Sequence, residues 1–297
     1  MLRLKCLLFC ALVLLYGCDR QDEPVTVSNQ VGNRYVTLAP AMSQILIDMQ
    51  QQSKIVGISQ FDDTAAKDLP VVGNYLDIHT EKLLTLNPTH VLMMTGKAGT
   101  PPTLVKLANR FGFTLLAYPY PDTIMQLQAI VLQMGKALNL TDESEQTLKQ
   151  MQQQLAGLKE QTQNLTPLRV LAVIGTDPIM ASGPNTVMDD LIQWVGGVNV
   201  AHDSPVSAPV FDREKMIQLQ PDVILLLSPG AALLTDGFTD SRLQEFQGLP
   251  IPAVENQRIV LINDPLTFLP ATTLPRIATQ IAHALYPQLA KKIADVQ

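Results

Sequence analysis

Short runs of apolar residues alternate along the chain with stretches in which apolar residues recur every three or four positions. The runs predict strands and the spaced stretches predict helices. In the first part of the chain the predicted strands are 35–38, 54–58, 90–94 and 114–118, and the predicted helices are 42–49, 80–86 and 104–111. Near-continuous apolar runs are typical of parallel strands buried on both faces. The alternation therefore predicts an α/β lobe with an open parallel sheet over residues 34–120.

The pattern changes between residues 121 and 166, where no strand interrupts a long amphipathic stretch. Its apolar positions share a spacing of three and four residues, which places them on one face of a helix. They are Ile124, Leu127, Ile130, Val131, Met134 and Leu138. The spacing predicts a linker helix over 121–166, in which the segment 139–142 allows a break or a cap. A second α/β lobe is predicted over 167–297, with strands at 169–174, 223–227 and 259–262.

The two predicted lobes contain an internal repeat. The block 81–88, EKLLTLNP, matches the block 214–221, EKMIQLQP, and the two blocks start 133 positions apart. Each block leads directly into an apolar strand. This repeat predicts an α/β fold of two Rossmann-like lobes with parallel sheets, joined by a single long backbone helix. Open parallel sheets bind ligands at the carboxyl ends of their strands, so a ligand cleft is expected between the lobes.

The N-terminus has the proportions of a targeting segment. Arg3 and Lys5 precede an unbroken apolar run over 6–16, which is too short to span a membrane. The run ends in Leu-Tyr-Gly-Cys at 15–18, which resembles the lipobox of bacterial lipoproteins. That resemblance implies a signal peptide at 1–17, a lipid on Cys18 and a polar tether over 18–33. An ordinary signal peptide cut nearby is the alternative. The expected location is the periplasm, anchored to the inner membrane, because Asp19 resembles the signal that retains lipoproteins there.

Composition and motifs exclude several classes of function. The formal net charge is −6, with no long basic run, which argues against nucleic acid as a partner. The three cysteines all lie within the first eighteen residues, so no disulfide or thiolate metal site is expected further along. The sequence has no nucleophile elbow, phosphate-binding loop or histidine pair of metal-site spacing. We therefore expect no enzyme activity, no resident metal and no cofactor.

Loops that follow the predicted strands are the expected ligand contacts. The candidates in these loops are Pro40, Phe61, Tyr75, Thr95, Ser182, Ala208 and Asp264. Phe61 and Tyr75 have side chains that stack on a large flat ligand, because an aromatic face contributes much contact area at little entropic cost. Packing of both rings against their own lobe is the alternative.

Five segments carry a resemblance to a known family. They are YVTLAP at 35–40, IVGIS at 55–59, VGNY at 72–75, the block 81–88, and PDVIL at 221–225. Together they resemble the helical-backbone class of ABC-transporter substrate-binding proteins, whose members carry cobalamin, ferric siderophores or haem. The resemblance covers nearly all of the chain after the tether. Within the class the sequence is most similar to the cobalamin binders.

The resemblance implies roles for individual residues. Phe61 takes the place of a pocket tyrosine and Tyr75 that of a pocket tryptophan. Ala208 and Met180 stand at ligand-contact positions where the cobalamin binders carry aromatic residues. The haem binders have a tyrosine at the position of Asn74.

Glu81 and Glu214 correspond to the glutamates, one on each lobe, that dock onto arginines of the membrane permease. The alternative is that each is a first-turn acid stabilised by its helix dipole. The expected function is capture of a corrinoid or iron chelate, with haem and ferric siderophore as rivals. A tethered sensor or scaffold without a small ligand is the alternative of another class.

Overall fold

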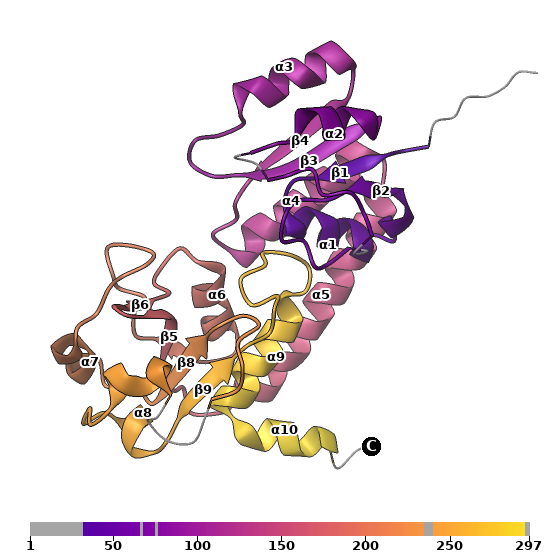
Figure 1. Cartoon of the computed structure of the whole chain (residues 1–297). Coiled ribbons are helices and arrows are strands. Elements are labelled where there is room, and N and C mark those ends of the chain that lie inside the picture. Colours follow the sequence, from indigo (N-terminus) through magenta and orange to yellow (C-terminus); the bar gives the residue numbers. More distant parts are fainter. Residues whose placement is uncertain (1–31, 66–67, 75–76, 235–239, 295–297) are drawn as a thin grey trace, which may run out of the picture. The chain divides into compact units, whose positions relative to one another are not determined.

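The computed structural model describes residues 32–65, 68–74, 77–234 and 240–294 (Figure 1). The described residues from Asn33 onward form one compact unit. The predicted signal peptide at 1–17, Cys18 and nearly all of the tether lie outside the described residues. Among the described helices, none has the length and apolar character needed to cross a membrane.

The N-terminal lobe is built on a parallel sheet with the strand order β2-β1-β3-β4. Its strands are β1 (Tyr35–Thr37), β2 (Ile55–Gly57), β3 (His90–Thr95) and β4 (Thr114–Pro119). Its helices are α1 (Pro40–Asp48), the 3-10 turn η1 (Gln52–Lys54), α2 (Thr80–Thr85) and α3 (Pro102–Phe111). The α/β lobe predicted from the sequence is thus present.

The C-terminal lobe has the sheet order β6-β5-β8-β9. Its strands are β5 (Arg169–Thr176), β6 (Ile179–Ala181), β7 (Val198–Asn199), β8 (Val223–Leu227) and β9 (Ile259–Ile262). Strands β7, β8 and β9 are parallel to their neighbours, whereas β6 folds back antiparallel along β5. Its helices are α6 (Val187–Trp194), α7 (Arg213–Leu219), η3 (Ser241–Phe246), α8 (Pro252–Glu255), α9 (Leu274–Leu285) and α10 (Pro287–Ala294).

The linker predicted over 121–166 contains two helices, α4 (Ile124–Leu138) and α5 (Thr141–Thr162), and the break between them falls within 139–142, where the sequence allows one. Asn139 ends α4 in a left-handed conformation with a φ of 57°, and asparagine adopts this conformation more readily than most residues. Gly135 lets α5 approach α4 closely, because a Cβ at this position would collide with the Ser144 side chain. The long helix that joins the lobes is therefore α5 alone, 22 residues long.

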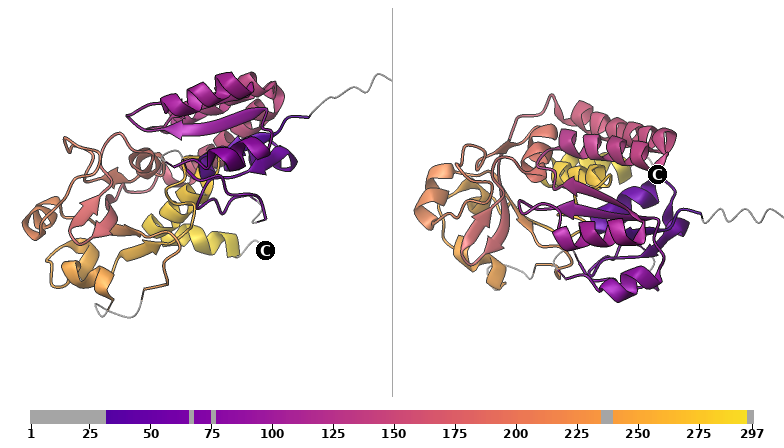
Figure 2. Two further views of the ribbon diagram at one scale, coloured as in Figure 1. Left: turned by 45° about the horizontal axis from the view of Figure 1, so that its top comes forward. Right: turned by 90° about the horizontal axis from the view of Figure 1, so that it is seen from above.

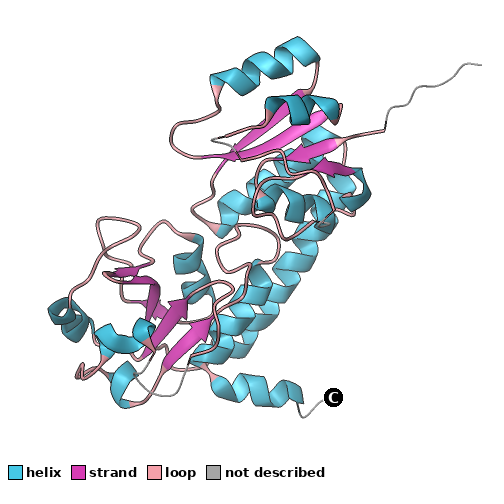
Figure 3. Cartoon of the chain, viewed as in Figure 1, coloured by secondary structure: helices cyan, strands magenta, loops and turns pink. Residues whose placement is uncertain are grey.

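One hydrophobic core runs through both lobes. Side chains alternate between the two faces of each sheet: Leu92 and Met94 of β3 belong to the shared core, whereas Val91 and Met93 pack on the opposite face. Helices α4, α5 and α9 lie together along this shared core (Figure 2). Figure 3 shows strands of the two sheets against this helical layer. The lobes are thus joined by packing as well as by the chain.

The sequence repeat is also a structural repeat. Helices α2 and α7 occupy the two matching blocks, and Asn87 and Gln220 follow them in left-handed conformations with φ of 46° and 43°. Arg34, just before β1, donates from Nε and Nη2 to the carbonyl of Leu86. In the same way Arg169, at the start of β5, donates to the carbonyl of Leu219. In both lobes an arginine thus satisfies a carbonyl at the helix end, where the helix leaves such groups unpaired.

Among the residues that the structure describes, three hydrogen bonds also join the lobes. The Tyr120 hydroxyl, after β4, donates to the Phe268 carbonyl, after β9, at 3.0 Å. The backbone N–H of Ile124 in α4 donates to Asp190 Oδ2 in α6 at 2.9 Å. The Thr272 hydroxyl, before α9, donates to Asp48 Oδ2 at the end of α1. Contacts thus cross between the lobes at three separate places.

Candidate ligand-binding cleft

Two adjoining cavities lie between the lobes, with volumes of about 490 Å³ and 340 Å³. Four residues line both of them: Tyr120, Phe268, Leu269 and Pro270. Each volume is within the range of about 300–1,000 Å³ that is usual for small-molecule sites. The two cavities therefore form one cleft, at the edge where the strands of both sheets end.

The larger cavity brings together three of the predicted residues, Pro40, Phe61 and Thr95. Pro40 begins α1, separated by two residues from the end of β1, and Thr95 is the last residue of β3. Phe61 follows β2 in a left-handed backbone conformation with a φ of 64°, and its side chain is 83% exposed. These three residues form the N-terminal wall of the cleft.

The smaller cavity brings together two more of the predicted residues, Ser182 and Ala208. Their loops meet because Gly183 donates its N–H to the Ser207 carbonyl at 2.8 Å. A side chain at position 183 would collide with the Val206 carbonyl, so the approach requires glycine. These loops form the C-terminal wall of the cleft.

The remaining predicted residues lie elsewhere. Met180 is half-buried in β6, opposite Val210, and lines neither cavity. Tyr75 lies outside the described residues. Asp264 is buried, and its Oδ2 accepts hydrogen bonds from Arg276 Nε at 2.5 Å and Gln280 Nε2 at 2.7 Å. The Asp264 carboxylate is therefore occupied by α9 and lines neither cavity.

Two aromatic residues of the cleft, Tyr120 and Phe268, are not predicted by the sequence analysis. Their side chains are 53% and 44% exposed, and both line both cavities. The Tyr120 hydroxyl donates to the Phe268 carbonyl, and desolvation of the phenol raises its pKa. The signal for Tyr120 is its place directly after β4, where a parallel sheet is expected to meet its ligand.

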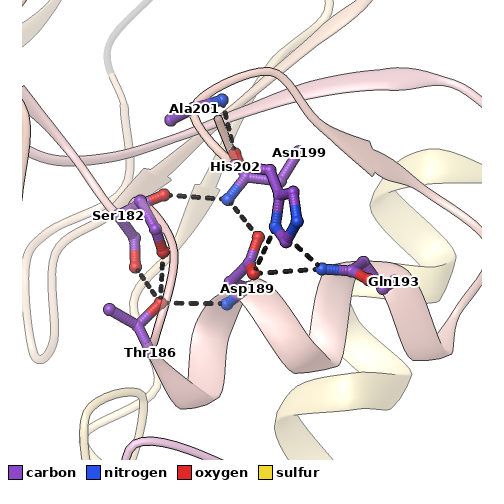
Figure 4. Close-up of polar contacts among 8 residues, drawn as sticks. Ser182, Thr186, Asp189, Gln193, Asn199, Ala201 and His202 are labelled. Carbon is purple, nitrogen blue, oxygen red and sulfur yellow. Dashed lines mark hydrogen bonds and ion pairs between the residues drawn. The ribbon is translucent and has the colours of Figure 1, made fainter. Parts of the chain in front are cut away.

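A buried polar network supports the C-terminal wall (Figure 4). At its centre is Asp189, whose Oδ1 accepts from Asn199 Nδ2 at 2.7 Å. Asp189 Oδ2 accepts from His202 Nδ1 at 2.8 Å and from Gln193 Nε2 at 3.0 Å. The hydrogen bond to Asp189 and the negative charge of its carboxylate raise the pKa of the half-exposed His202.

This network reaches the cleft through Thr186. The Thr186 hydroxyl accepts from the Asp189 N–H at 3.1 Å and lies 2.9 Å from the Ser182 hydroxyl. Thr186 and Ser182 both line the smaller cavity. Asn199 Nδ2 donates both to Asp189 Oδ1 and, at 2.9 Å, to the Ser182 carbonyl, so this part of the cleft wall is tied to the buried Asp189 carboxylate.

The two predicted docking residues lie on equivalent helices. Glu81 is in the first turn of α2 and Glu214 in the first turn of α7, and both are exposed. Within the part of the chain that the structure describes, no group of three or more histidine, cysteine or acidic side chains is placed to hold a metal ion.

Two α/β lobes, a joining helix and a cleft lined by loops from both lobes define a solute-binding protein. Residues 36–266 match the family model of the periplasmic binding proteins, and the chain belongs to this family. A relative in Yersinia pseudotuberculosis serotype O:3 (strain YPIII), a vitamin B12-binding protein, is 24% identical over 204 residues, which are 68% of this chain and 72% of the relative.

Solved structures with different ligands share the fold. The periplasmic vitamin B12 binding protein BtuF of Vibrio cholerae aligns with a TM-score of 0.67 at 24% identity, covering 89% of this chain and 98% of that one. The periplasmic heme binding protein HutB of Vibrio cholerae aligns with a TM-score of 0.71 at 24% identity, covering 86% and 99%. The two-lobed fold predicted from the sequence is thus confirmed.

Proposed function

We propose that this protein captures a corrinoid and delivers it to the membrane permease of an ABC importer. The observation that carries this proposal is the character of the cleft. It is mostly apolar, and its walls carry three exposed aromatic side chains, Phe61, Tyr120 and Phe268. Aromatic rings on several sides of a cleft suit a large ring ligand, because they cover its faces with little loss of side-chain entropy.

The charge of the cleft favours a corrinoid over haem. Haem carries two propionate carboxylates, whereas the corrin rim of cyanocobalamin presents neutral amides, and the single phosphate of its nucleotide loop is balanced within the molecule by the charged cobalt centre. Among the described residues that line the two cavities there is no lysine or arginine, and Asp122 is the one carboxylate. A buried anion without a cationic partner is costly. The same argument disfavours anionic ferric siderophores.

Three described cleft residues have the chemistry of an axial haem ligand: the thioethers Met94 and Met188, and Tyr120, whose phenol oxygen could ligate iron as a tyrosine does in some haem proteins. A ligating tyrosine binds iron through the deprotonated oxygen. The raised pKa of Tyr120 and the hydrogen bond that it donates to Phe268 both favour the protonated phenol. We therefore assign Tyr120 a packing role, in which its ring lies against the ligand.

The proposal includes a docking surface. Glu81 and Glu214 are exposed, and each is the second residue of its helix in equivalent blocks of the two lobes. Charges at the rim of an interface steer encounter and fix its register. One glutamate on each lobe suits a permease that contacts both lobes through arginines.

The proposal also includes an attachment to the inner membrane on its periplasmic side, through a lipid on Cys18. It is supported by the sequence alone, through the Leu-Tyr-Gly-Cys segment at 15–18. Such an anchor keeps the binding protein near its permease. Two or more acyl chains are needed to hold a protein stably.

The experiment is a calorimetric titration of the full chain, purified in mild detergent, with cyanocobalamin, haemin and a ferric hydroxamate. We expect cyanocobalamin to bind at least about a hundredfold more tightly than haemin, because the two propionates would remain unpaired. Tighter binding of haemin or of the hydroxamate would refute the corrinoid assignment. Binding of none of the three would favour a sensor or scaffold without a small ligand.

A further inference from the structure

Phe61 has an unusual backbone conformation for a bulky residue. Its φ of 64° lies in the left-handed region, which few residues other than glycine, asparagine and aspartate adopt. The residue as a whole is 83% exposed, so packing of its side chain does not compensate for this conformation. A strained residue persists only where its surroundings impose the strain, and such residues cluster at ligand sites.

The residues on either side of Phe61 are held firmly. On one side, Gln60 donates its N–H to the Gly73 carbonyl at 2.7 Å. On the other side, the Asp62 side chain points inward and is 7% exposed. Asp62 Oδ1 accepts from the N–H of Thr64 at 3.0 Å and from its hydroxyl at 2.6 Å. Phe61 is therefore the exposed residue between two anchored neighbours.

The second carboxylate oxygen of Asp62 is tied to the beginning of the lobe. Ser43 of α1 donates its hydroxyl hydrogen to Asp62 Oδ2 at 2.5 Å. The Thr37 hydroxyl, at the end of β1, lies 2.6 Å from the Ser43 oxygen. Because a serine hydroxyl has a single hydrogen, Thr37 is the donor in that bond. Thr37 and Ser43 are fully buried, where hydrogen bonds to a charged group are strong.

We propose that Asp62 is a positioning residue of the cleft, which holds Phe61 in the conformation that presents its ring to the ligand. The carboxylate links the Phe61 loop to β1 and α1, the same elements that carry Pro40 into the larger cavity. This inference rests on the proposed function, since it concerns the affinity of the same cleft. The neighbouring Asp63 is exposed and is the matched control.

The first test needs no ligand. The full chain in mild detergent is labelled with 4-fluorophenylalanine, and the fluorine resonance of Phe61 is assigned by its loss in Phe61→Leu. We expect Asp62→Asn to shift or broaden this resonance, because the amide cannot accept all the hydrogen bonds that the carboxylate accepts. Asp63→Asn is expected to leave it unchanged. An unaltered Phe61 resonance in Asp62→Asn would overturn the proposal.

The second test measures affinity for cyanocobalamin and for haemin by calorimetry. Asp62→Asn is expected to weaken binding of the better probe by about fivefold or more, because fewer molecules carry the competent Phe61 conformation. Asp63→Asn is expected to stay within about twofold. In a Phe61→Ala background, Asp62→Asn is expected to change the affinity by less than about twofold, since the two residues act as a unit. An undiminished loss in that background would overturn the positioning role.

A further variant covers the case in which Asp62→Asn does not fold. Ser43→Ala removes one of the hydrogen bonds to Asp62 and leaves the carboxylate in place, and it is expected to alter the Phe61 resonance in the same direction. If the unmodified protein binds neither probe, the proposed function fails. The fluorine measurement then still decides whether Asp62 positions Phe61.

Discussion

Removal of the Tyr120 ring is expected to weaken ligand binding, because Tyr120 lines both cavities. A covered aromatic side chain buries about 150–250 Å², so an exposed fraction of 53% leaves on the order of 100 Å² for a ligand to cover. At about 25 cal/mol per Å² this area is worth about 2.5 kcal/mol. Part of it faces solvent, so we expect Tyr120→Ala to cost about 1–2 kcal/mol, or about five- to thirtyfold in Kd.

The assay is calorimetric titration of the full chain with cyanocobalamin, and two variants serve as comparisons. Tyr120→Phe keeps the ring and removes the hydroxyl, and it is expected to bind within about threefold of the unmodified protein. Phe111→Ala removes a ring of similar exposure, 49%, which lies at the end of α3 and lines neither cavity. A Tyr120→Ala loss no larger than that of Phe111→Ala would refute the packing role. An equal loss in Tyr120→Phe would assign the contact to the hydroxyl.

Three further predictions address the other proposed roles. Glu81→Arg combined with Glu214→Arg is expected to abolish uptake in cells while the Kd for cyanocobalamin stays within about threefold, since rim charges act on docking. Unimpaired uptake by the double variant would contradict the docking role, and a melting curve detects the loss of about 0.3–1 kcal/mol per site that a helix-dipole role predicts. The pair of His202 with Asp189 raises the imidazole pKa, so it adds stability that is fully present below the ordinary pKa of about 6.5 and is lost as the pH rises through the folded value. The difference in unfolding free energy between the unmodified protein and His202→Ala is therefore expected to shrink from pH 5.5 to pH 8, and a difference that does not change with pH would refute this linkage. Cys18→Ser is expected to release the protein from the membrane fraction without changing its melting temperature, and continued detergent-dependent fractionation of this variant would exclude the lipid anchor.

Much of the fold could be predicted because apolar periodicity is a local property of the sequence. The strand at 90–94, the repeat blocks and the amphipathic stretch from Ile124 all appear where the pattern places them. The break between α4 and α5 falls where the sequence allows it, but the close packing of the two helices could not be predicted, since it depends on the approach of Ser144 to Gly135. That contact joins residues on two helices, and helical spacing alone does not report it.

The cleft was only partly predictable, because position after a strand does not determine which way a side chain points. Pro40, Phe61 and Thr95 line the larger cavity. Asp264 also follows a strand, yet its carboxylate turns to Arg276 on α9, a partner twelve positions away. The rule that predicts Pro40 applies equally to Tyr120, since both follow a strand. Resemblance to a known family points to Phe61 but gives Tyr120 no role.

The three hydrogen bonds between the lobes bear on how a bound ligand leaves. Hinge opening would break all three and leave two carboxylates, those of Asp48 and Asp190, without these partners. Spontaneous separation of the lobes is therefore disfavoured, because these hydrogen bonds must be exchanged for bonds to water. A membrane partner that binds both lobes at once can supply the free energy of separating them, because its own binding offsets the loss of these hydrogen bonds. Such a partner would then control the release of the ligand from the cleft more than its binding from solution.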